Sequence, residues 1–262
     1  MPSVLPLEIE ESILDLLAED DKGHSALKTC SLVCHAFLPI CRKHIFGSIV
    51  LTYHQLASPP FGRLLRETPE IADYIRKLEL ELNYNIRFAD STALSIQESL
   101  KHISRLEFLT IPHKNGWTFD WSNNPIRPAL LHLLHLPTLT HFKMSEINNF
   151  VISDLIPCVN LKYLDIGSYT TLAAENTFPA AFPEHPIQLN EFVARSDTSA
   201  AIEKLCTARR PDGQPIIDFG FLSKITVYID RREAQELLRR CRVLTSVDTC
   251  CKWYLHRDHQ DF

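Results

Sequence analysis

Glycine is scarce in this chain, with 7 residues in 262, and no glycine-rich loop has the spacing of a dinucleotide-binding or P-loop motif. Long apolar runs are absent as well, because charged residues or prolines interrupt every window of about 20 residues, the length that a membrane-spanning helix requires. Glu8, Glu10 and Glu11 stand where a secretory signal peptide would have basic residues and an apolar run. We therefore expect no export signal and no membrane partner.

Positive charge is not in excess either. The formal net charge is −5 and the isoelectric point is about 6.2, and no strongly basic face stands out, so we expect no nucleic-acid partner. No Gly-x-Ser-x-Gly elbow, His-Glu-x-x-His motif or recognisable Cys/His arrangement occurs. His132 and His135 lie three residues apart, but no carboxylate accompanies them as a metal site would require. We predict no catalytic residue, no metal site and no cofactor.

The composition is that of an ordinary folded protein, with 45% hydrophobic and 23% charged residues. The chain is long enough for a small N-terminal module and one larger domain. Four of the 8 cysteines, namely Cys30, Cys34, Cys41 and Cys158, fall within apolar helical or strand patterns. Without an export signal, they are best interpreted as reduced, buried thiols. We expect an intracellular protein, in the cytoplasm, the nucleus or both.

The first fifty residues predict three short helices that have more apolar residues than so small a unit can hide. The first helix has a stripe at helical spacing formed by Ile9, Ile13, Leu16 and Leu17. Ser25 is a suitable N-cap for a second helix that continues to Phe37, and Pro39 can open the third. Two sides of the second helix are apolar, which is typical of an interaction surface.

At these residues the sequence resembles the F-box, in the form found in the large fungal (basidiomycete-type) class. The matching positions are Leu5-Pro6-x-Glu8-Ile9, Ile13-Leu14, Leu27-x-x-Cys30-Ser31-Leu32-Val33-Cys34 and His44-Ile45-Phe46-x-Ser48-Ile49-x-Leu51. Phe37 stands where the family usually has Trp. The resemblance covers roughly residues 4–51 and implies docking on the Skp-type adaptor of a cullin-RING ubiquitin ligase. The residues expected to touch the adaptor are Leu5, Pro6, Ile9, Leu14, Leu32, Val33 and Phe37.

Two other interpretations of this segment stay open. The three helices can be a simple cap on the rest of the chain. A zinc site formed by Cys30, Cys34 and His35 with Cys41 and His44 is the other. Zinc ligands favour Cys-x2-4-Cys knuckles in turns, whereas these residues follow helical spacing among apolar neighbours, so the zinc interpretation is disfavoured.

Beyond residue 70 the pattern Leu-x-x-Leu-x-Leu recurs with conservative replacements. It starts at Ile75, Leu106, Leu139, Leu161, Leu189, Leu222 and Leu244, at separations of 22 to 33 residues. This spacing is typical of leucine-rich repeats, in which a short strand and a helix or irregular turn form each unit. Helices are predicted between the strands at 91–103, 128–136, 198–208 and 231–242, and projecting Pro-rich loops at 112–128 and 170–188.

The predicted fold is therefore α+β or α/β. It consists of a three-helix F-box module at 1–51, a connecting segment at 52–74, and an irregular leucine-rich-repeat-like solenoid with a parallel sheet at 75–262. Because the repeat lengths are uneven, an irregular α/β domain remains the competing interpretation.

Alternate residues of each strand point to opposite faces, so the x positions of the motif should face outward. The candidate substrate-binding residues at or next to these positions are His141, Lys143, Tyr163, Asp165, Arg195 and Tyr228. Mixed charges with aromatic residues are typical of a protein-binding face, and equally of a solvated strand face. Trp117 and Trp121 either form an exposed contact or, as we favour, fold back over the core.

The sequence thus predicts a substrate receptor of an SCF-type ubiquitin ligase, with the Skp-type adaptor and an unknown protein substrate as partners. The alternative is a leucine-rich-repeat scaffold, outside ubiquitin transfer, whose N-terminal helices cap the solenoid. An enzyme has no motif to support it.

Overall fold

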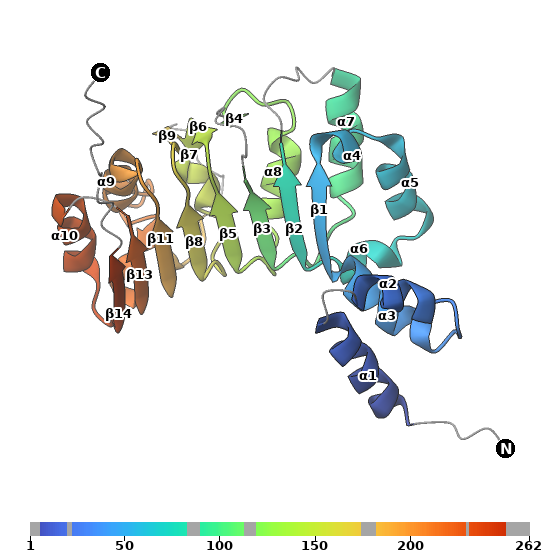
Figure 1. The fold of residues 1–262 in the computed structure, drawn as a ribbon. Helices are drawn as coiled ribbons and strands as arrows, with labels where there is room; N and C mark the ends of the chain where they lie inside the picture. Colours follow the sequence, from blue (N-terminus) through green and yellow to red (C-terminus); the bar gives the residue numbers. More distant parts are fainter. Residues whose placement is uncertain are drawn as a thin grey trace, which may run out of the picture. The chain divides into compact units, whose positions relative to one another are not determined.

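The structure is a computed structural model that describes residues 6–19, 23–82, 90–112, 119–173, 182–228 and 231–249. The chain divides into two compact units. The first consists of Met1–Lys114 and Asn123–His141, and the second of Asn115–Ser122 and Phe142–Phe262. Each unit combines helices with parallel strands, so the chain is mixed α/β (Figure 1). In the described ranges, no helix is both long enough and apolar enough to cross a membrane.

The first unit begins with three helices, α1 (Leu7–Glu19), α2 (Gly23–Cys30) and α3 (Phe37–Gly47), which contact one another. Glu8 and Glu10 in the first turn of α1 favour a helix start there, because they complement the positive end of the helix dipole. The three helices enclose a small core of Leu14, Leu27, Ile40 and Cys41.

The second helix is shorter than predicted, since α2 ends at Cys30 and residues 31–36 form turns. The N–H groups of Leu32 and Val33 bond to carbonyls three residues back, at 3.1 and 3.0 Å, which tightens the chain into turns. The Ser31 hydroxyl also donates to the carbonyl of Lys28 at 2.7 Å and competes with helical bonding. Leu32 and Val33 therefore lie in a turn between α2 and α3. The predicted N-cap, Ser25, lies inside α2.

The rest of the first unit forms a parallel sheet in the order β1-β2-β3. These strands are β1 (Ser48–Thr52), β2 (Lys77–Glu81) and β3 (Phe108–Ile111). The segment predicted as a connection contains α4 (Tyr53–Leu56), α5 (Pro59–Glu67) and α6 (Glu70–Tyr74). The unit also contains α7 (Asp90–Leu100) and α8 (Arg127–Leu134), which lie behind the strands in Figure 1.

The second unit has five main strands in the order β5-β8-β11-β13-β14. They are β5 (His141–Met144, whose first residue is grouped with the first unit), β8 (Tyr163–Ile166), β11 (Glu191–Ala194), β13 (Lys224–Val227) and β14 (Ser246–Thr249). Three two-residue pairs flank them: β4 (Phe119–Asp120) with β6 (Ile147–Asn148), β7 (Phe150–Val151) with β9 (Leu172–Ala173), and β10 (Ile187–Gln188) with β12 (Ile217–Asp218). Its helical elements are η1 (Ile152–Leu155), α9 (Ser199–Thr207), η2 (Phe219–Phe221) and α10 (Arg231–Arg240).

Each of the seven repeated motifs contains one of these strands, as predicted. Equivalent motif positions are also paired, since Leu78 faces Leu109 in the first unit, and Phe192 faces both Leu164 and Ile225 in the second. The apolar positions of the first six motifs are buried, which explains why the same spacing recurs. The predicted helices at 91–103, 128–136, 198–208 and 231–242 correspond to α7, α8, α9 and α10.

The two Pro-rich segments are not purely projecting loops. Trp121 is fully buried, its indole N–H donates to Asp154 Oδ2 at 2.7 Å, and its ring packs against Phe150. Leu172 is buried in β9. Short paired strands anchor these segments, and such two-residue elements leave no periodic signal in a sequence. Trp117 lies outside the described residues.

The predicted burial of thiols is correct for Cys41 and Cys158 but wrong for Cys34, which is exposed, while Cys30 is half-buried. Cys34 is exposed because it lies in the turns after α2 and not on a helix face. In α9, burial raises the pKa of the Cys206 thiol to about 11.

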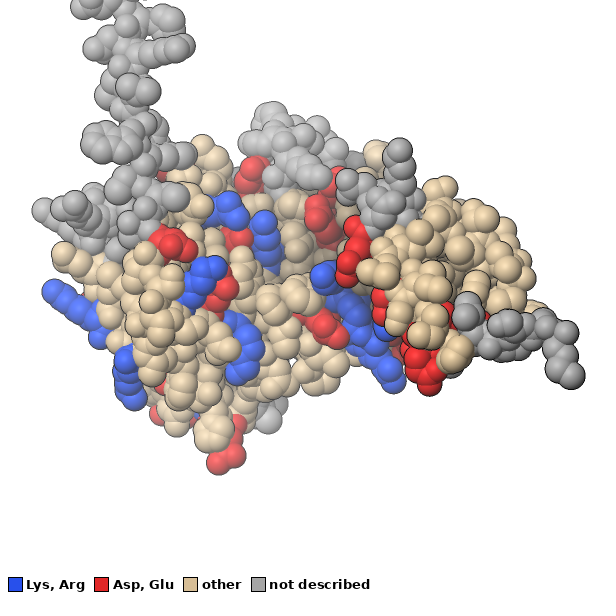
Figure 2. Space-filling view, turned by 60° about the horizontal axis from the view of Figure 1, so that its bottom comes forward, with Lys and Arg blue, Asp and Glu red and all other residues tan. Residues whose placement is uncertain are grey.

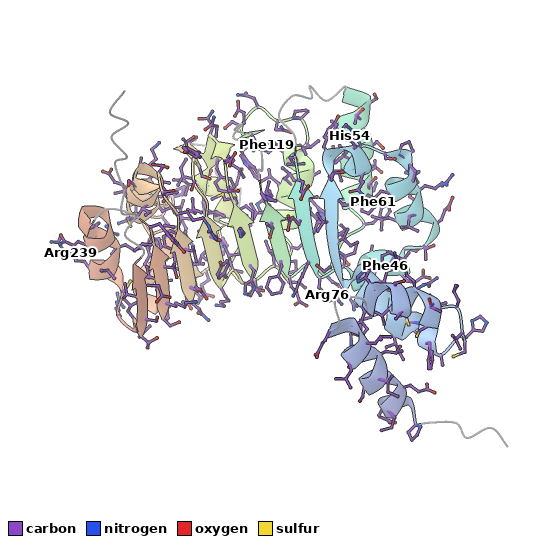
Figure 3. The ribbon with its side chains drawn as sticks, in the orientation of Figure 1. Phe46, His54, Phe61, Arg76, Phe119 and Arg239 are labelled. Atoms are coloured by element: carbon purple, nitrogen blue, oxygen red, sulfur yellow. The ribbon has the colours of Figure 1, made fainter. Side chains whose placement is uncertain are left out.

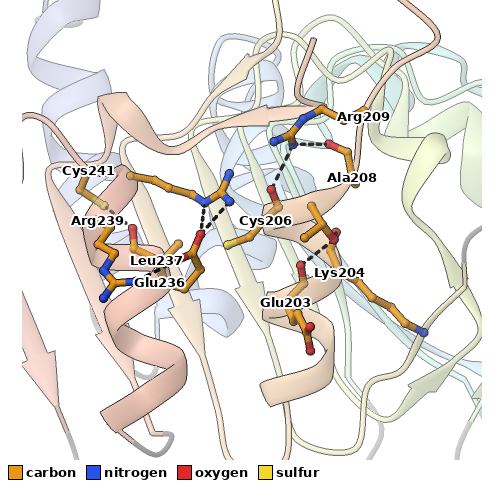
Figure 4. Close-up of polar contacts among 11 residues, drawn as sticks. Glu203, Lys204, Cys206, Ala208, Arg209, Glu236, Leu237, Arg239 and Cys241 are labelled. Atoms are coloured by element: carbon orange, nitrogen blue, oxygen red, sulfur yellow. Dashed lines mark hydrogen bonds and ion pairs between the residues drawn. The ribbon is translucent and has the colours of Figure 1, made fainter. Parts of the chain in front are cut away.

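Arg209 Nη1 donates to the carbonyls of Cys206 and Ala208 at 3.1 and 3.0 Å (Figure 4). These bonds satisfy the carbonyl of Cys206 in the last turn of α9 and that of Ala208 directly after the helix.

Candidate interaction surfaces

The N-terminal helices leave several large apolar side chains exposed, from two elements of the same module. We call this set the N-terminal apolar residues: Ile9, Ile13 and Leu16 of α1, and Leu32 and Val33 of the α2–α3 turn. Leu32 is 87% exposed and Val33 is 68% exposed. Exposed apolar groups concentrated in one small module are a feature of interaction sites.

Helical geometry explains why α1 has apolar residues on two sides. Leu14, Leu17 and Ala18 are spaced three and four residues apart and face the module core. Ile9 and Ile13 follow the same helical spacing along another side of the helix. One apolar face of α1 is thus used for folding, and the other is available to a partner.

Three of the residues predicted to touch an adaptor, Ile9, Leu32 and Val33, are well exposed. Pro6 is exposed too, and its carbonyl accepts the N–H of Ile9 at 3.0 Å where α1 begins. Leu5 lies outside the described residues.

The prediction that Leu14 contacts the adaptor is wrong. It is 2% exposed, in the core cluster with Leu27, Ile40 and Cys41, so a partner can reach it only if the module opens. Phe37 is half-buried and packs against the same cluster. The predicted set also omits Ile13 and Leu16, although their helical spacing from Ile9 indicates that all three belong to one stripe.

A groove of about 470 Å³ lies between α1 and the start of α3. It is lined by Glu11, Asp15, Ala36, Pro39, Ile40 and Lys43. Asp15 Oδ1 lies 2.7 Å from His44 Nε2, and this contact ties α1 to α3. A partner side chain can enter here beside the exposed face of α1.

In the second unit, three of the predicted substrate-binding residues, Lys143, Tyr163 and Arg195, converge on the carboxylate of a fourth, Asp165, and we call these four residues the Asp165 cluster. Arg195 of the β11 end donates to both carboxylate oxygens of Asp165, from Nε at 3.3 Å and from Nη2 at 3.1 Å. Lys143 Nζ lies 3.8 Å from Oδ2, and the Tyr163 hydroxyl donates to the same oxygen at 3.5 Å. Tyr228 also interacts electrostatically with Arg195.

Asp165 is fully buried, which corrects the prediction that it faces outward to a substrate. Its carboxylate is covered by the side chains that it binds, so it positions Arg195 and Lys143 for contact while being unable to make that contact itself. Lys224 and Glu191 form a further pair at 2.8 Å on this face. Figure 2 shows positive and negative side chains interspersed on the face in view, with no field of one sign.

His141 takes part in a different arrangement, within the first unit. Its ring stacks on Phe108 with centroids 4.0 Å apart, and Lys77 Nζ lies 4.9 Å from the centroid of Phe108 on β3. Thr140 Oγ1 lies 2.8 Å from His141 Nδ1 and fixes the ring. An exposed lysine and a half-exposed phenylalanine and histidine thus form a stack that suits a protein contact.

Burial raises the pKa of Tyr163 to about 12, and the charges of Asp165 and Glu191 add to the shift. The folded state favours the neutral phenol of Tyr163, so its pKa there is higher than the ordinary value of about 10. The stability that the neutral phenol contributes to the folded state is therefore fully present below pH 10 and is lost as the pH rises toward 12. We expect Tyr163→Phe to reduce the fall in unfolding free energy across this window. Urea denaturation at several pH values measures it, and equal pH slopes for both proteins would contradict the assignment.

No group of three or more His, Cys, Asp or Glu side chains suited to a metal ion occurs among the described residues. Comparison of the chain with protein-family models and with curated proteins found no match.

Proposed function

We propose that this protein is the substrate-receptor subunit of an SCF-type cullin-RING ubiquitin ligase. In this proposal residues 1–51 are an F-box that docks on the Skp-type adaptor, and the strand faces recruit a target protein. The observation that carries the proposal is the exposure of Leu32 and Val33 at the end of the Leu27-to-Cys34 motif. Fully burying each of these side chains against a partner is worth about 1.5–3 kcal/mol.

The repeat pattern supports the second half of the proposal. Equivalent positions of successive motifs pair in parallel strands, as leucine-rich repeats require. The half-exposed Lys143, Arg195 and Tyr228 give this face cationic and aromatic groups that can bind a protein.

Such a receptor does no chemistry itself. It holds the target near the ubiquitin-charged enzyme and raises its effective concentration there. An intracellular location, cytoplasmic or nuclear, is part of the proposal, because the adaptor and cullin act inside the cell.

The proposal is tested by replacing the exposed turn residues with aspartate and measuring capture of a Skp-type adaptor. We expect Leu32→Asp or Val33→Asp to weaken adaptor binding at least about 30-fold, the effect of losing a hot-spot residue worth about 2 kcal/mol. Both side chains are exposed, so the variants should fold like the wild type. Isothermal titration with purified adaptor gives the affinities.

Leu94→Asp is the matched control, since Leu94 is 61% exposed on α7, outside the N-terminal helices. It should leave adaptor affinity within about twofold of wild type. Failure of the wild-type protein to bind any Skp-type adaptor, or equal binding by all three variants, would refute the F-box assignment.

A capping scaffold is the second candidate, and one observation favours it. Helix α3 runs directly into β1 and contacts α6, so the N-terminal helices are continuous with the sheet of the first unit. Deleting residues 1–50 cannot distinguish the two functions, because it removes Ser48–Val50 from the β1–β2 pairing. The aspartate variants do distinguish them, since a cap does not need Leu32 or Val33 to bind an adaptor.

A further inference from the structure

A second cavity in the first unit has a chemistry that the proposed function does not use. It has a volume of about 670 Å³ and lies where the N-terminal helices meet the starts of β1 and β2. The lining residues are Ala18, His24, Leu27, Lys43, His44, Gly47, Ser48, Tyr74, Arg76, Lys77 and Glu107. The lining comes from the N-terminal helices, from the start of β1, from the segment Tyr74–Lys77 and from Glu107, which folding brings together.

The fixed charges of the lining are mostly positive. Lys43, Arg76 and Lys77 face a single carboxylate, that of Glu107, so the cavity has an excess of two positive charges before either histidine is protonated. This contrasts with the net charge of −5 of the whole chain. Asp15 pairs with His44 but is not part of the lining.

Arg76 is anchored on one side by backbone carbonyls and by Glu107. Its Nη1 donates to the carbonyls of Asp73 at 2.5 Å and of Ile75 and Arg105 at 3.4 Å. Its Nε lies 3.4 Å from Glu107 Oε1, while Nη2 takes no part in these contacts. Figure 3 shows Arg76 near the N-terminal end of the strands, below β1. A guanidinium fixed on one side is pre-organised to donate to an anion on the other.

The remaining polar groups are donors or adaptable cations. Lys43 and Lys77 are exposed and lie on different elements, so their ammonium groups can approach an anion from two directions. The hydroxyl groups of Ser48 and Tyr74 supply further donors. Glu107, the one carboxylate of the lining, is occupied by Arg76.

We infer that this cavity binds a phosphate monoester dianion. Two excess positive charges match its charge, a guanidinium with lysines matches its oxygen geometry, and the volume leaves room for the group that bears the phosphate. A free phosphate ester and a phosphorylated protein side chain share this chemistry. The inference goes beyond the proposed function, because none of the N-terminal apolar residues lines the cavity.

The test is a titration of the full chain with two probes, glycerol 2-phosphate and a short neutral peptide carrying one phosphoserine, by isothermal calorimetry at low salt. We expect saturable binding of at least one probe with a Kd below about 1 mM. The double variant Lys43→Gln/Lys77→Gln should weaken it at least about tenfold. Arg76 is left intact, since its backbone cage contributes to folding.

Lys28→Gln is the matched control, because Lys28 is exposed on α2 but outside the lining. It should change the affinity less than about twofold. Binding of the peptide alone identifies a phosphorylated protein as the source, and binding of both probes identifies the phosphate group itself. No saturable binding by the wild type, equal binding by the double variant, or an equal loss in the control would overturn the inference. Lys43 also lines the groove beside α1, so the single variant Lys77→Gln, whose residue lies outside that groove, separates the two assignments. It should weaken probe binding while leaving adaptor affinity unchanged, and this result is independent of the F-box assignment.

Discussion

Replacing Leu14 by alanine is expected to lower the free energy of unfolding by about 2–5 kcal/mol, whereas Ile13→Ala should change it by less than about 0.5 kcal/mol. The two residues are adjacent on α1, but Leu14 is 2% exposed and Ile13 is 51% exposed. Truncating Leu14 leaves a cavity among Leu27, Ile40 and Cys41, while truncating the half-exposed Ile13 leaves no enclosed cavity in this core. Urea denaturation followed by circular dichroism measures both.

The same pair separates folding from binding. Under the proposed function, Ile13→Ala should weaken adaptor binding while leaving stability unchanged. A destabilisation by Ile13→Ala equal to that of Leu14→Ala would mean that the two faces of α1 are assigned incorrectly.

Replacing Arg195 by methionine is expected to destabilise the second unit by about 2 kcal/mol, less than breaking a fully buried ion pair costs, because the Arg195 side chain is 42% exposed while that of Asp165 is buried. Asp165 is buried beneath Arg195, so its carboxylate loses its bidentate partner, and Lys143 at 3.8 Å compensates only in part. Adding Asp165→Asn should recover part of the loss. Denaturant unfolding of the single and double variants measures this coupling.

Lys224→Met is the matched control on the same face. Its pair with Glu191 is closer, at 2.8 Å, but both side chains are partly solvated. Such a pair contributes about 1 kcal/mol or less. A larger loss for Lys224→Met than for Arg195→Met would show that distance, and not burial, governs ion-pair stability on this face.

The strands could be predicted from sequence because each short strand repeats one local rule. Leu78 and Leu80 alternate with partly exposed residues, and the same alternation returns in β3, β5 and β13, whereas the middle positions Asp165 of β8 and Val193 of β11 are buried as well. Burial of alternate residues is a local requirement, so it appears as periodicity. The two-residue strands β4 and β9 have no such period and were predicted as loops.

The end of α2 could not be predicted, because Leu32 and Val33 have the residue types of a buried helix. The chain leaves the helix where the N–H groups of Leu32 and Val33 bond to carbonyls three residues back, and only the structure shows these bonds. Leu14 illustrates the same limit, since apolar residues on two sides of a helix do not say which side the other helices cover.

The sequence identified the residues of the Asp165 cluster as candidates but did not predict how they contact one another. Alternation places Lys143, Tyr163 and Asp165 on one face, but the pairing that buries the carboxylate depends on strand neighbours. The basic cavity leaves no sequence signal at all, because Lys43 and Lys77 are brought together only by folding.

The equal register of β8, β11, β13 and β14 bears on how such a chain can change through evolution. Each strand pairs with the next one through equivalent residues, so one whole repeat, a strand with its connection, can be duplicated or deleted without changing the register of the other pairs. The face can therefore be lengthened in whole steps by gene duplication, while point mutations at its outward positions alter what it recognises.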